Sequence, residues 1–592
     1  MALRELMGTA ASEGLAIGRA VVMREEAAPQ AMAYIEAGAE EAELLRFDRA
    51  VAAAAQELEA LRSRMEAEER EQEAEIFEAH LMLLEDEELI GQAQSSIREQ
   101  RFSADSAMSD AADKVAELLA SLDDAYLRER AADIRDVSRR VIRLLRAGQG
   151  PDGVLAFVGN DEGLERSEKS VLIAHDLTPS DTAQLDTASI AGFITAIGGR
   201  TSHSAIIARS VGIPAVVGTG KAIDEVKDGQ LVIVDGGTGI VLVEPTESEL
   251  AHYRELQRRQ AARQERLKPF HGLPSVSADG HRVELVANIG SVQDAQQALK
   301  QGAEGIGLFR TEFLFMGRPD LPKEDEQFAA YRSVAETFGK DAPIVIRTMD
   351  IGGDKELPSL QLDREENPFL GYRAIRISLD RPELFKTQLR AILKASAYGN
   401  LKVMFPMIAT LEEWRKAKGL LEACKQELTT EGVPYNERIE AGIMIEIPAA
   451  ALLADRFARE ADFFSIGTND LVQYTMAADR MNSKLGYLSD PLHPAVLRLI
   501  EMVIRAAHRE NKWAGMCGEM AGQPMALPIL LGMGLDEFSM SAAAVLPARA
   551  LIAELDRGKL IDLADKVLEL EDAAAVREYV KQHVPALNEV LD

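Results

Sequence analysis

The second half of this 592-residue chain repeats one pattern: a short apolar run that ends in polar or charged residues, followed by a segment with helical periodicity. The runs lie at residues 283–288, 305–310, 344–347, 401–406, 442–446, 463–470 and 515–519, and residues 371–376 supply an eighth. Short apolar strands that alternate with helices are typical of parallel sheets. Eight units within residues 273–592 favour a closed (β/α)8 barrel of the TIM type over an open sheet. In such a barrel the functional side chains lie where the strands end.

The first part of the chain changes its character twice. Residues 1–24 and 147–246 contain short apolar segments with glycine, which predict strands and an α/β domain. The apolar runs of the second segment are 154–158, 171–174, 192–195 and 231–236. Residues 25–146 have few glycines and a helical spacing of apolar residues, so we expect an α-helical bundle inserted into the α/β domain. Residues 247–272 are rich in Arg, Gln and Glu and predict an exposed linker helix, which is a candidate hinge.

His203 follows a glycine-rich turn at residues 198–202 and precedes an apolar pattern with helical spacing. The glycines allow a tight turn that brings backbone amides close to an anion, and Arg200, Thr201 and Ser202 add donors at the start of the helix. The positive end of a helix disfavours imidazolium, so the ring would stay neutral and nucleophilic near pH 7. The turn therefore predicts a phosphorylated histidine. A surface histidine near an ordinary helix cap fits this short motif as well, so the rest of the chain decides between the two.

Charged side chains accumulate where the apolar runs of the second half end. Glu446 and Asp470 close two successive runs, and their carboxylates would converge as oxygen ligands for Mg²⁺ with open positions for a phosphorylated substrate. The guanidinium groups that end or follow the runs belong to Arg310, Arg347, Arg373 and Arg480. Four such groups beside two acids indicate a doubly anionic substrate, and Lys355 adds a further positive charge. A strand-end cap or an ion-pair partner is the alternative for each of the two carboxylates taken alone, and one arginine alone would mean little.

The chain has two cysteines, Cys424 and Cys517, which are far apart in sequence and show no metal-ligand spacing. Buried free cysteines are usually inert, but Cys517 ends a late apolar run, and a thiol in a substrate site can donate a proton to an enolate carbon. A net charge of −31 disfavours nucleic acid and anionic membranes as partners. No stretch has the length and apolarity of a membrane span or a secretion signal, so we expect a cytoplasmic protein without membrane insertion. Residues 36–90 hold 18 acidic and 5 basic residues, which fits either a solvated helix face or a docking surface for a basic protein.

Several long motifs, taken together, resemble a known family. They are residues 198–203, 308–316, 347–355, 366–373, 462–474 and 515–519. In this order they are similar to Enzyme I of the bacterial phosphotransferase system, a phosphoenolpyruvate-protein phosphotransferase, and the resemblance covers nearly the whole chain. Met481 after Arg480, where the family commonly has glycine, and Ile447 after Glu446, where some members have threonine, are small departures that remove no functional group.

The resemblance implies a role for each candidate residue. His203 would be the phosphorylated residue, and Cys517 would protonate enolpyruvate to pyruvate. Phosphoenolpyruvate would be held by Arg310, Arg347, Arg373, Asn469 and Arg480. Glu446 and Asp470 would bind Mg²⁺. The phosphoryl group would then pass to an HPr-type phosphocarrier docked on the helical domain, as the first general step of sugar uptake, and the barrel would form a homodimer.

Three alternatives stay open at this point. Pyruvate phosphate dikinase and phosphoenolpyruvate synthase share the histidine domain and the barrel, but they add a large ATP-binding domain for which the region before His203 is too short. A paralogue that feeds a regulatory branch, and a catalytically inactive phospho-signalling scaffold, are the other two. In-line transfer also requires His203 to reach a substrate bound in the barrel, so we expect the histidine domain to swing about residues 247–268.

Overall fold

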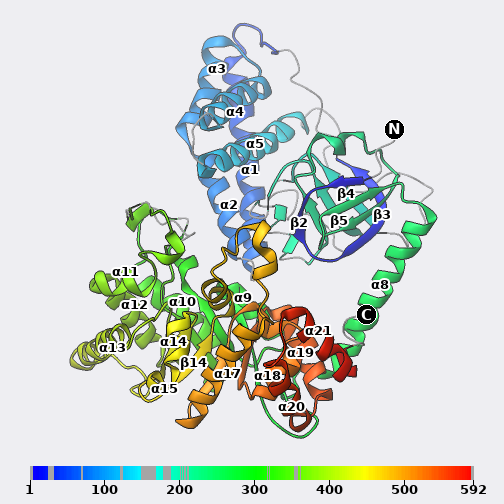
Figure 1. The fold of residues 1–592 in the computed structure, drawn as a ribbon. Coiled ribbons are helices and arrows are strands. Elements are labelled where there is room, and N and C mark those ends of the chain that lie inside the picture. Colours follow the sequence, from blue (N-terminus) through cyan, green and yellow to red (C-terminus); the bar gives the residue numbers. More distant parts are fainter. Residues whose placement is uncertain are drawn as a thin grey trace. The chain divides into compact units, whose positions relative to one another are not determined.

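The computed structural model describes residues 5–587 except 24–31, 68–70, 121–124, 148–168, 178–188, 200–201, 203, 206–207, 210–211, 317, 319, 353–357, 361 and 364. The chain divides into two compact units, residues 1–262 and 263–592 (Figure 1). Helix α8 (Glu247–Leu267) spans the boundary between them. Within the described part of the chain, no helix has the length and apolar character needed to cross a membrane.

The first unit contains an eight-stranded mixed sheet with the order β1-β8-β7-β3-β4-β5-β6-β2. Its strands are β1 (Glu5–Met7), β2 (Thr9–Ser12), β3 (Leu15–Val22), β4 (Ser170–Ala174), β5 (Ile190–Thr195), β6 (Ala215–Val217), β7 (Leu231–Asp235) and β8 (Ile240–Val243). Strands β3 and β4 pair in parallel, with Arg19 opposite Ser170, although nearly 150 residues separate them in sequence. The chain therefore leaves the sheet after β3 and returns to the neighbouring position, which confirms a helical insertion in an α/β domain. The expected strand at 154–158 lies outside the described residues.

The insertion is helical, as the spacing of apolar residues predicts. Its helices are α1 (Glu40–Ala67), α2 (Glu71–Leu83), α3 (Gln92–Gln100), α4 (Ala104–Ala120) and α5 (Ala125–Ala147), with a π-helical turn η1 (Glu87–Gly91) before α3. Phe47, Leu58, Phe77, Met108 and Val141 are buried in one core that the helices share. Because this core contains no residue of the sheet, the bundle has the character of a separate layer within the first unit.

Helix α8 differs from these helices because none of its residues is buried. Its first turn has a capping box, in which the Glu249 side chain accepts hydrogen bonds from the backbone and hydroxyl of Thr246. A helix of 21 residues with no buried face is held mainly by such local contacts, which agrees with the expected exposed linker helix. The division at residues 24, 146, 246 and 272 stays a prediction.

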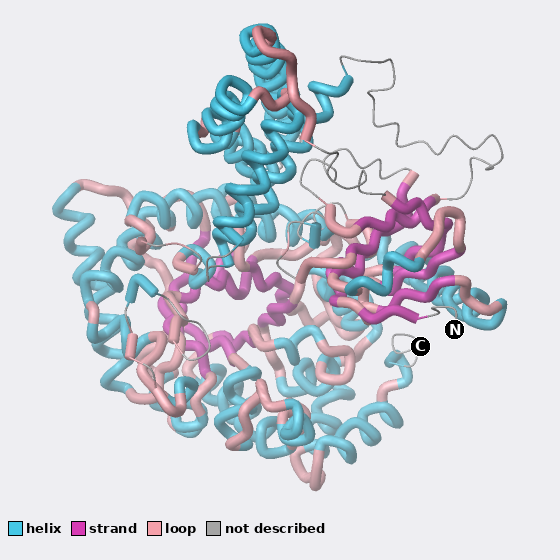
Figure 2. The backbone as a smooth tube through the Cα atoms, turned by 90° about the horizontal axis from the view of Figure 1, so that it is seen from above, coloured by secondary structure: helices cyan, strands magenta, loops and turns pink. Residues whose placement is uncertain are grey.

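The second unit is a closed barrel of eight parallel strands, visible as a ring of strands surrounded by helices in Figure 2. The strands are β9 (Glu284–Ile289), β10 (Ile306–Arg310), β11 (Pro343–Arg347), β12 (Asn400–Phe405), β13 (Ala441–Ile445), β14 (Phe463–Ile466), β15 (Trp513–Met516) and β16 (Glu537–Met540). The helices are α9 (Val292–Lys300), α10 (Glu324–Phe338), α11 (Ile375–Asp380), α12 (Pro382–Ala395), α13 (Leu411–Glu431), α14 (Pro448–Leu452), α15 (Ala454–Phe457), α16 (Thr468–Met476), α17 (Pro494–Arg509), α18 (Leu527–Met533), α19 (Ala542–Glu554), α20 (Arg557–Val567) and α21 (Ala573–His583).

The sequence identified seven of the eight barrel strands, and the eighth assignment was wrong. Residues 371–374 form a loop, with Ala374 at a φ of 52°, residues 375 and 376 begin α11, and no strand begins there. The remaining strand is β16, which pairs with β15 and β9 and closes the barrel. It has only four residues and begins with the buried Glu537, so it lacks the apolar run on which the prediction relied.

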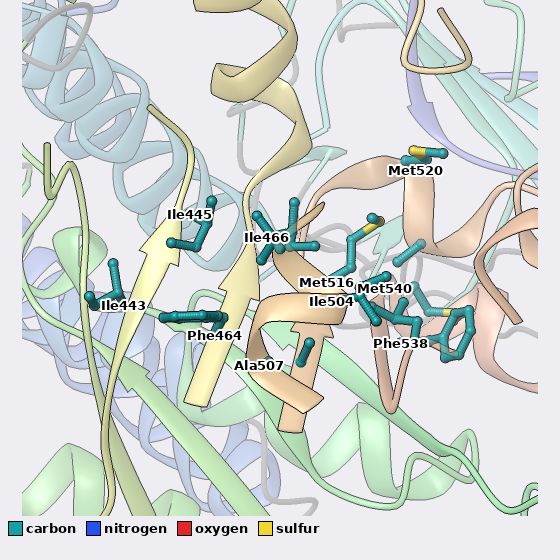
Figure 3. Close-up of a cluster of buried hydrophobic side chains, with 14 of the residues drawn as sticks. Ile443, Ile445, Phe464, Ile466, Ile504, Ala507, Met516, Met520, Phe538 and Met540 are labelled. Carbon is teal, nitrogen blue, oxygen red and sulfur yellow. The ribbon is translucent and has the colours of Figure 1, made fainter. Parts of the chain in front are cut away.

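Strand alternation divides the barrel core into an outer and an inner layer. Ile443, Phe464, Ile466 and Phe538 point outward and pack with helix residues such as Ile504 of α17 in the large outer core (Figure 3). Each such side chain contributes about 2 kcal/mol when fully buried. The inner layer is small and contains Leu308, Val345, Met404, Met444, Phe463 and Cys517. The barrel interior is thus filled by side chains, and any ligand has to bind at a strand end.

Candidate active site

The charged side chains expected from the sequence gather at the carboxyl end of the barrel. Arg310 and Arg347 are the last residues of β10 and β11, and Glu446 and Cys517 directly follow β13 and β15. Asn469 and Asp470 lie in the first turn of α16, immediately after β14. Because all eight strands are parallel, their carboxyl ends meet at one face of the barrel, and these residues therefore belong to one site.

Arg347 and Arg373 form the buried centre of this site. One nitrogen of Arg347 lies 2.7 Å from Glu312 and another lies 3.0 Å from Asp350. Arg373 lies 2.8 Å from the other oxygen of Asp350 and 3.6 Å from Asp470. Burial by itself lowers the pKa of both guanidinium groups, but these carboxylates outweigh it and raise the pKa of each. Both arginines are therefore cations, fixed by a carboxylate that they share.

Glu446 and Asp470 are the two carboxylates expected to hold a metal ion. Glu446 is fully buried, and one of its oxygens accepts a hydrogen bond of 2.6 Å from the Met407 backbone N–H. Burial first, then the charges of Asp470 and Asp350, raise the pKa of Glu446 to about 8. A Cβ at Gly467 would lie 3.2 Å from that of Glu446, so a glycine here lets the two strand ends approach closely.

These two carboxylates fit a magnesium ion that takes its remaining ligands from a substrate or water. Asp470 has one buried oxygen, Oδ1, that finds no hydrogen-bond partner in the described part of the chain. Among the described residues, no group of three or more His, Cys, Asp or Glu side chains is arranged to hold a metal ion. Magnesium commonly binds through one or two carboxylates together with substrate phosphates, so a pair of carboxylates beside a phosphate site agrees with this chemistry.

Arg480 borders the site from the loop after α16. Its guanidinium group lies 3.3 Å from Asp470 and 5.6 Å from the centre of the Phe369 ring. Arg373 lies 5.8 Å from the same ring, and the Tyr474 hydroxyl donates a hydrogen bond of 2.5 Å to the Phe369 carbonyl oxygen. The aromatic ring thus faces two cations and supports their position.

Arg310 and Asn469 are less constrained than the other polar groups of the site. The Arg310 side chain makes no ion pair or hydrogen bond with any residue that the structure describes. Asn469 accepts a hydrogen bond of 3.3 Å from the Glu519 backbone N–H, which leaves its amide NH₂ for a ligand. A strand-end arginine without a counter-ion among the described residues is suited to an anionic group of a ligand, and an amide donor to an oxygen of that ligand.

Cys517 is buried in the inner layer of the barrel beside these groups. Its backbone N–H donates a hydrogen bond of 3.1 Å to the Ile466 carbonyl oxygen, which fixes the start of the loop after β15. Burial raises the pKa of the thiol to about 11, against the smaller opposite effects of Ser465, Arg347 and Arg310. The thiol is therefore protonated at neutral pH and is able to act as an acid rather than as a nucleophile.

Four functional groups were missed from the sequence: Glu312, Asp350, Phe369 and Tyr474. Glu312 and Asp350 follow Arg310 and Arg347 by two and three residues, so each lies in the turn that carries an arginine. That spacing is the available signal, because a buried arginine at a strand end needs a counter-ion nearby. Phe369 and Tyr474 belong to motifs that the sequence singled out, but nothing in the pattern distinguishes an aromatic ring beside an arginine from a core residue.

His203 and Lys355 lie outside the described residues. The turn before His203 is described in part: Gly198 has a φ of 115°, and the Ser202 hydroxyl donates a hydrogen bond of 2.8 Å to the Gly199 carbonyl oxygen. Ser204 and Ala205 have helical backbone, and the Ser202 oxygen accepts a hydrogen bond of 3.4 Å from the Ala205 N–H. A serine cap after a glycine with positive φ is the tight turn into a helix that the sequence predicts.

Known proteins of one family match nearly the whole chain. Three family models match: "PEP-utilising enzyme, N-terminal" at residues 7–130, "PEP-utilising enzyme, mobile domain" at 166–239, and "PEP-utilising enzyme, PEP-binding domain" at 264–557. The chain is 52% identical over 585 residues to a phosphoenolpyruvate-protein phosphotransferase of Bacillus sp. (strain S), with 98% of this chain and 99% of the relative covered. The proteins of that name from Geobacillus stearothermophilus and Bacillus subtilis (strain 168) are 52% and 48% identical, with 98% of this chain and 99% and 100% of the relatives covered.

Proposed function

This chain belongs to the phosphoenolpyruvate-protein phosphotransferases, and on that premise we propose that its barrel binds phosphoenolpyruvate and that His203 accepts the phosphoryl group. The observation that carries the proposal for the barrel is the buried pair Arg347 and Arg373, joined by Asp350, with Arg310 opposite Arg347 and without an ion-pair partner among the described residues. Phosphoenolpyruvate has a phosphate and a carboxylate, and a site with several guanidinium groups is suited to both.

The individual roles follow from the position of each group. Arg310, Arg347 and Arg373 bind the phosphate and carboxylate oxygens, because Arg310 and Arg347 end neighbouring strands and Arg373 joins them from the loop before α11. Asn469 donates its amide N–H to the substrate, and Arg480 closes the site from its loop. For Lys355, which lies outside the described residues, we propose a further positive charge toward the substrate on the strength of its place in the motif at residues 347–355. Bound substrate would replace part of the protein's own ion pairs, such as the one between Arg480 and Asp470.

We propose Mg²⁺ as the cofactor, with Glu446 and Asp470 as its protein ligands. When bound, the ion neutralises charge on the phosphoryl group and orients it. Glu446 would have to lose its proton on binding the metal, since its pKa in the metal-free protein is about 8.

The protein side chains divide the phosphoryl transfer into two steps. A ring nitrogen of His203 attacks phosphorus while the bond between phosphorus and the enolate oxygen breaks, and the electron pair stays on the enolate. The Cys517 thiol then donates its proton to the enolate carbon, which gives pyruvate, and the thiolate takes up a proton from solvent. The burial that raises the thiol pKa to about 11 keeps that proton available at neutral pH.

We propose that phosphorylated His203 passes its group to an HPr-type phosphocarrier docked on the helical bundle, in the first general step of sugar uptake. Residues 85–88, all acidic, line a hollow of about 570 Å³ where α2, η1 and α3 meet, and such a surface attracts a basic protein. The exposed α8 would serve as the linker about which the histidine domain swings. We further propose a homodimer formed through the barrel.

The test is incubation with ³²P-labelled phosphoenolpyruvate, with and without Mg²⁺, followed by measurement of acid-labile label on the protein. We expect label on the wild type with Mg²⁺, none on His203→Ala, and transfer to added HPr. His175→Ala is the matched control, because His175 is an exposed histidine of the same α/β domain. Label that survives in His203→Ala would assign the acceptor to another residue, and absence of label on the wild type would leave the inactive scaffold as the better hypothesis.

A further inference from the structure

A buried hydrogen-bond network lies behind the site, between the barrel strands and helices α10 and α12. Its centre is Gln388 of α12, which is 2% exposed. The Gln388 amide nitrogen donates to the Thr311 hydroxyl at 3.0 Å and to the Tyr331 hydroxyl at 3.1 Å. The Gln388 amide oxygen accepts from the Met349 backbone N–H at 2.9 Å. One side chain thus contacts a helix and the turns after two strands.

The hydrogen bonds of this network form a chain in which each donor meets an acceptor. Tyr331 donates to the Gln327 amide oxygen at 3.1 Å, and the Gln327 nitrogen donates to the Pro322 carbonyl oxygen at 3.0 Å. At the other end, Thr311 donates to the Arg347 carbonyl oxygen at 2.8 Å. Because the Met349 N–H can only donate, the Gln388 amide cannot turn over without losing its bonds. A satisfied buried network of this kind holds its members in one arrangement.

Two of these bonds end next to the charged groups of the site. Thr311 directly follows Arg310, and its bond to the Arg347 carbonyl joins the ends of β10 and β11. Met349 directly precedes Asp350, the carboxylate that binds Arg347 and Arg373 together. Gln388 therefore contacts the turn that directly follows Arg310 and the turn that leads from Arg347 to Asp350, the counter-ion that Arg347 shares with Arg373.

We propose that Gln388 is a positioning residue for substrate binding, which fixes the turns after β10 and β11 at the spacing that Arg310 and Arg347 need to hold phosphoenolpyruvate. The inference rests on the proposed function of these arginines. A methionine would fill a similar volume between its buried neighbours, so the amide adds directed bonds rather than packing. Displacement of a binding group by about 1 Å is enough to lower the rate by up to two orders of magnitude.

Gln388→Met is the first test, with Gln327→Met as its matched control. Both glutamines are buried, both bind the Tyr331 hydroxyl, and only Gln388 contacts the two turns. Single-turnover labelling of the full chain over a range of phosphoenolpyruvate concentrations gives the half-saturating concentration and the limiting rate. We expect Gln388→Met to raise the half-saturating concentration about tenfold while the limiting rate falls less. Gln327→Met should stay within about twofold of the wild type, although both variants melt at a lower temperature.

Thr311→Val tests the same contact from the other side and decides the matter if Gln388→Met does not fold. Alone it should raise the half-saturating concentration to a similar extent, and the double variant should cost less than the sum of the two single variants, because both changes break the hydrogen bond between Gln388 and Thr311. An equal effect in Gln327→Met would assign the change to general loosening of the core and overturn the proposal. An unchanged half-saturating concentration in Gln388→Met would overturn it as well. If Arg347→Met leaves the half-saturating concentration unchanged, the proposed binding site itself is wrong, independently of Gln388.

Discussion

Glu537 is expected to make the stability of the barrel depend on pH across the neutral range. It is the first residue of β16, its side chain is buried, and neither carboxylate oxygen has a hydrogen-bond partner among the residues that the structure describes. Glu284 pairs with it directly across the sheet, and the nearby Lys402 already binds Glu440. Burial first, then the charge of Glu284, raise the pKa of Glu537 to about 8, with Asp536 and Glu440 acting in the same direction and Lys402 against them.

The sign and size of the effect follow from proton linkage. The folded-state pKa of Glu537, about 8, lies above its ordinary value of 4.5, so the fold favours the neutral acid. Its contribution to stability is complete below pH 4.5 and is lost as the pH rises toward 8. At about 1.4 kcal/mol per unit, the free energy of unfolding falls by about 3 to 4 kcal/mol between pH 5 and pH 8. For a barrel of roughly 330 residues this corresponds to about 5 °C in melting temperature.

Glu537→Gln removes the ionisation and nearly preserves the shape. Both tryptophans of the chain, Trp414 and Trp513, lie in the barrel, so their fluorescence during urea unfolding reports the barrel alone. We expect the stability of the variant relative to the wild type to rise by about 3 to 4 kcal/mol from pH 5 to pH 8, whatever constant offset the buried amide introduces. Glu437→Gln, at an exposed position before β13, is the control and should keep the slope of the wild type. Parallel curves for wild type and Glu537→Gln would refute the reasoning.

Three further predictions concern the site and its supporting fold. Cys517→Ala should retain single-turnover phosphorylation of His203 but release pyruvate more slowly, as measured by coupled reduction of pyruvate; full pyruvate output would remove the acid role. Arg373→Lys should lower kcat/KM for phosphoenolpyruvate by about 100-fold, because a lysine cannot reproduce the planar fork that meets Asp350, and steady-state kinetics near wild type would contradict this. Thr410→Ala should reduce the free energy of unfolding by about 1 kcal/mol in urea titrations, because Thr410 caps α13 in a capping box; an unchanged midpoint would show that the cap contributes nothing.

The barrel and the location of its site could be predicted because both depend on patterns that repeat along the chain. Apolar runs mark strands, and a closed parallel sheet brings their ends together. Strand β16 escaped the pattern because it begins with a buried glutamate, which interrupts the apolar run. Residues 371–376 were mistaken for a strand because apolar residues between glycine and arginine look alike in a strand and in a loop that leads into a helix.

The pairing of charges within the site could not be predicted from the sequence, for a different reason. Arg347 binds Glu312 and Asp350, which precede and follow it, while Arg373 shares Asp350 from a separate loop. Which acid meets which arginine depends on side-chain directions at strand ends, and sequence spacing does not determine these. The role of Gln388 was hidden in the same way, since a glutamine in an amphipathic helix is normally taken for a surface residue.

Glu446 and Glu537 illustrate why a raised pKa alone does not identify a catalytic group. In both side chains burial is the main cause of a pKa near 8, and a neighbouring carboxylate is the second. Their surroundings differ, because Glu446 accepts a hydrogen bond from Met407 and lies among the charges of Arg347 and Arg373. Glu537 has mainly acidic neighbours and no hydrogen-bond partner within the described ranges. A bound metal ion or anionic substrate changes the charges around Glu446, so the ionisation of Glu446 is coupled to binding. The surroundings of Glu537 lack the paired arginines that would attract an anionic ligand, and the ionisation of Glu537 is coupled to unfolding instead.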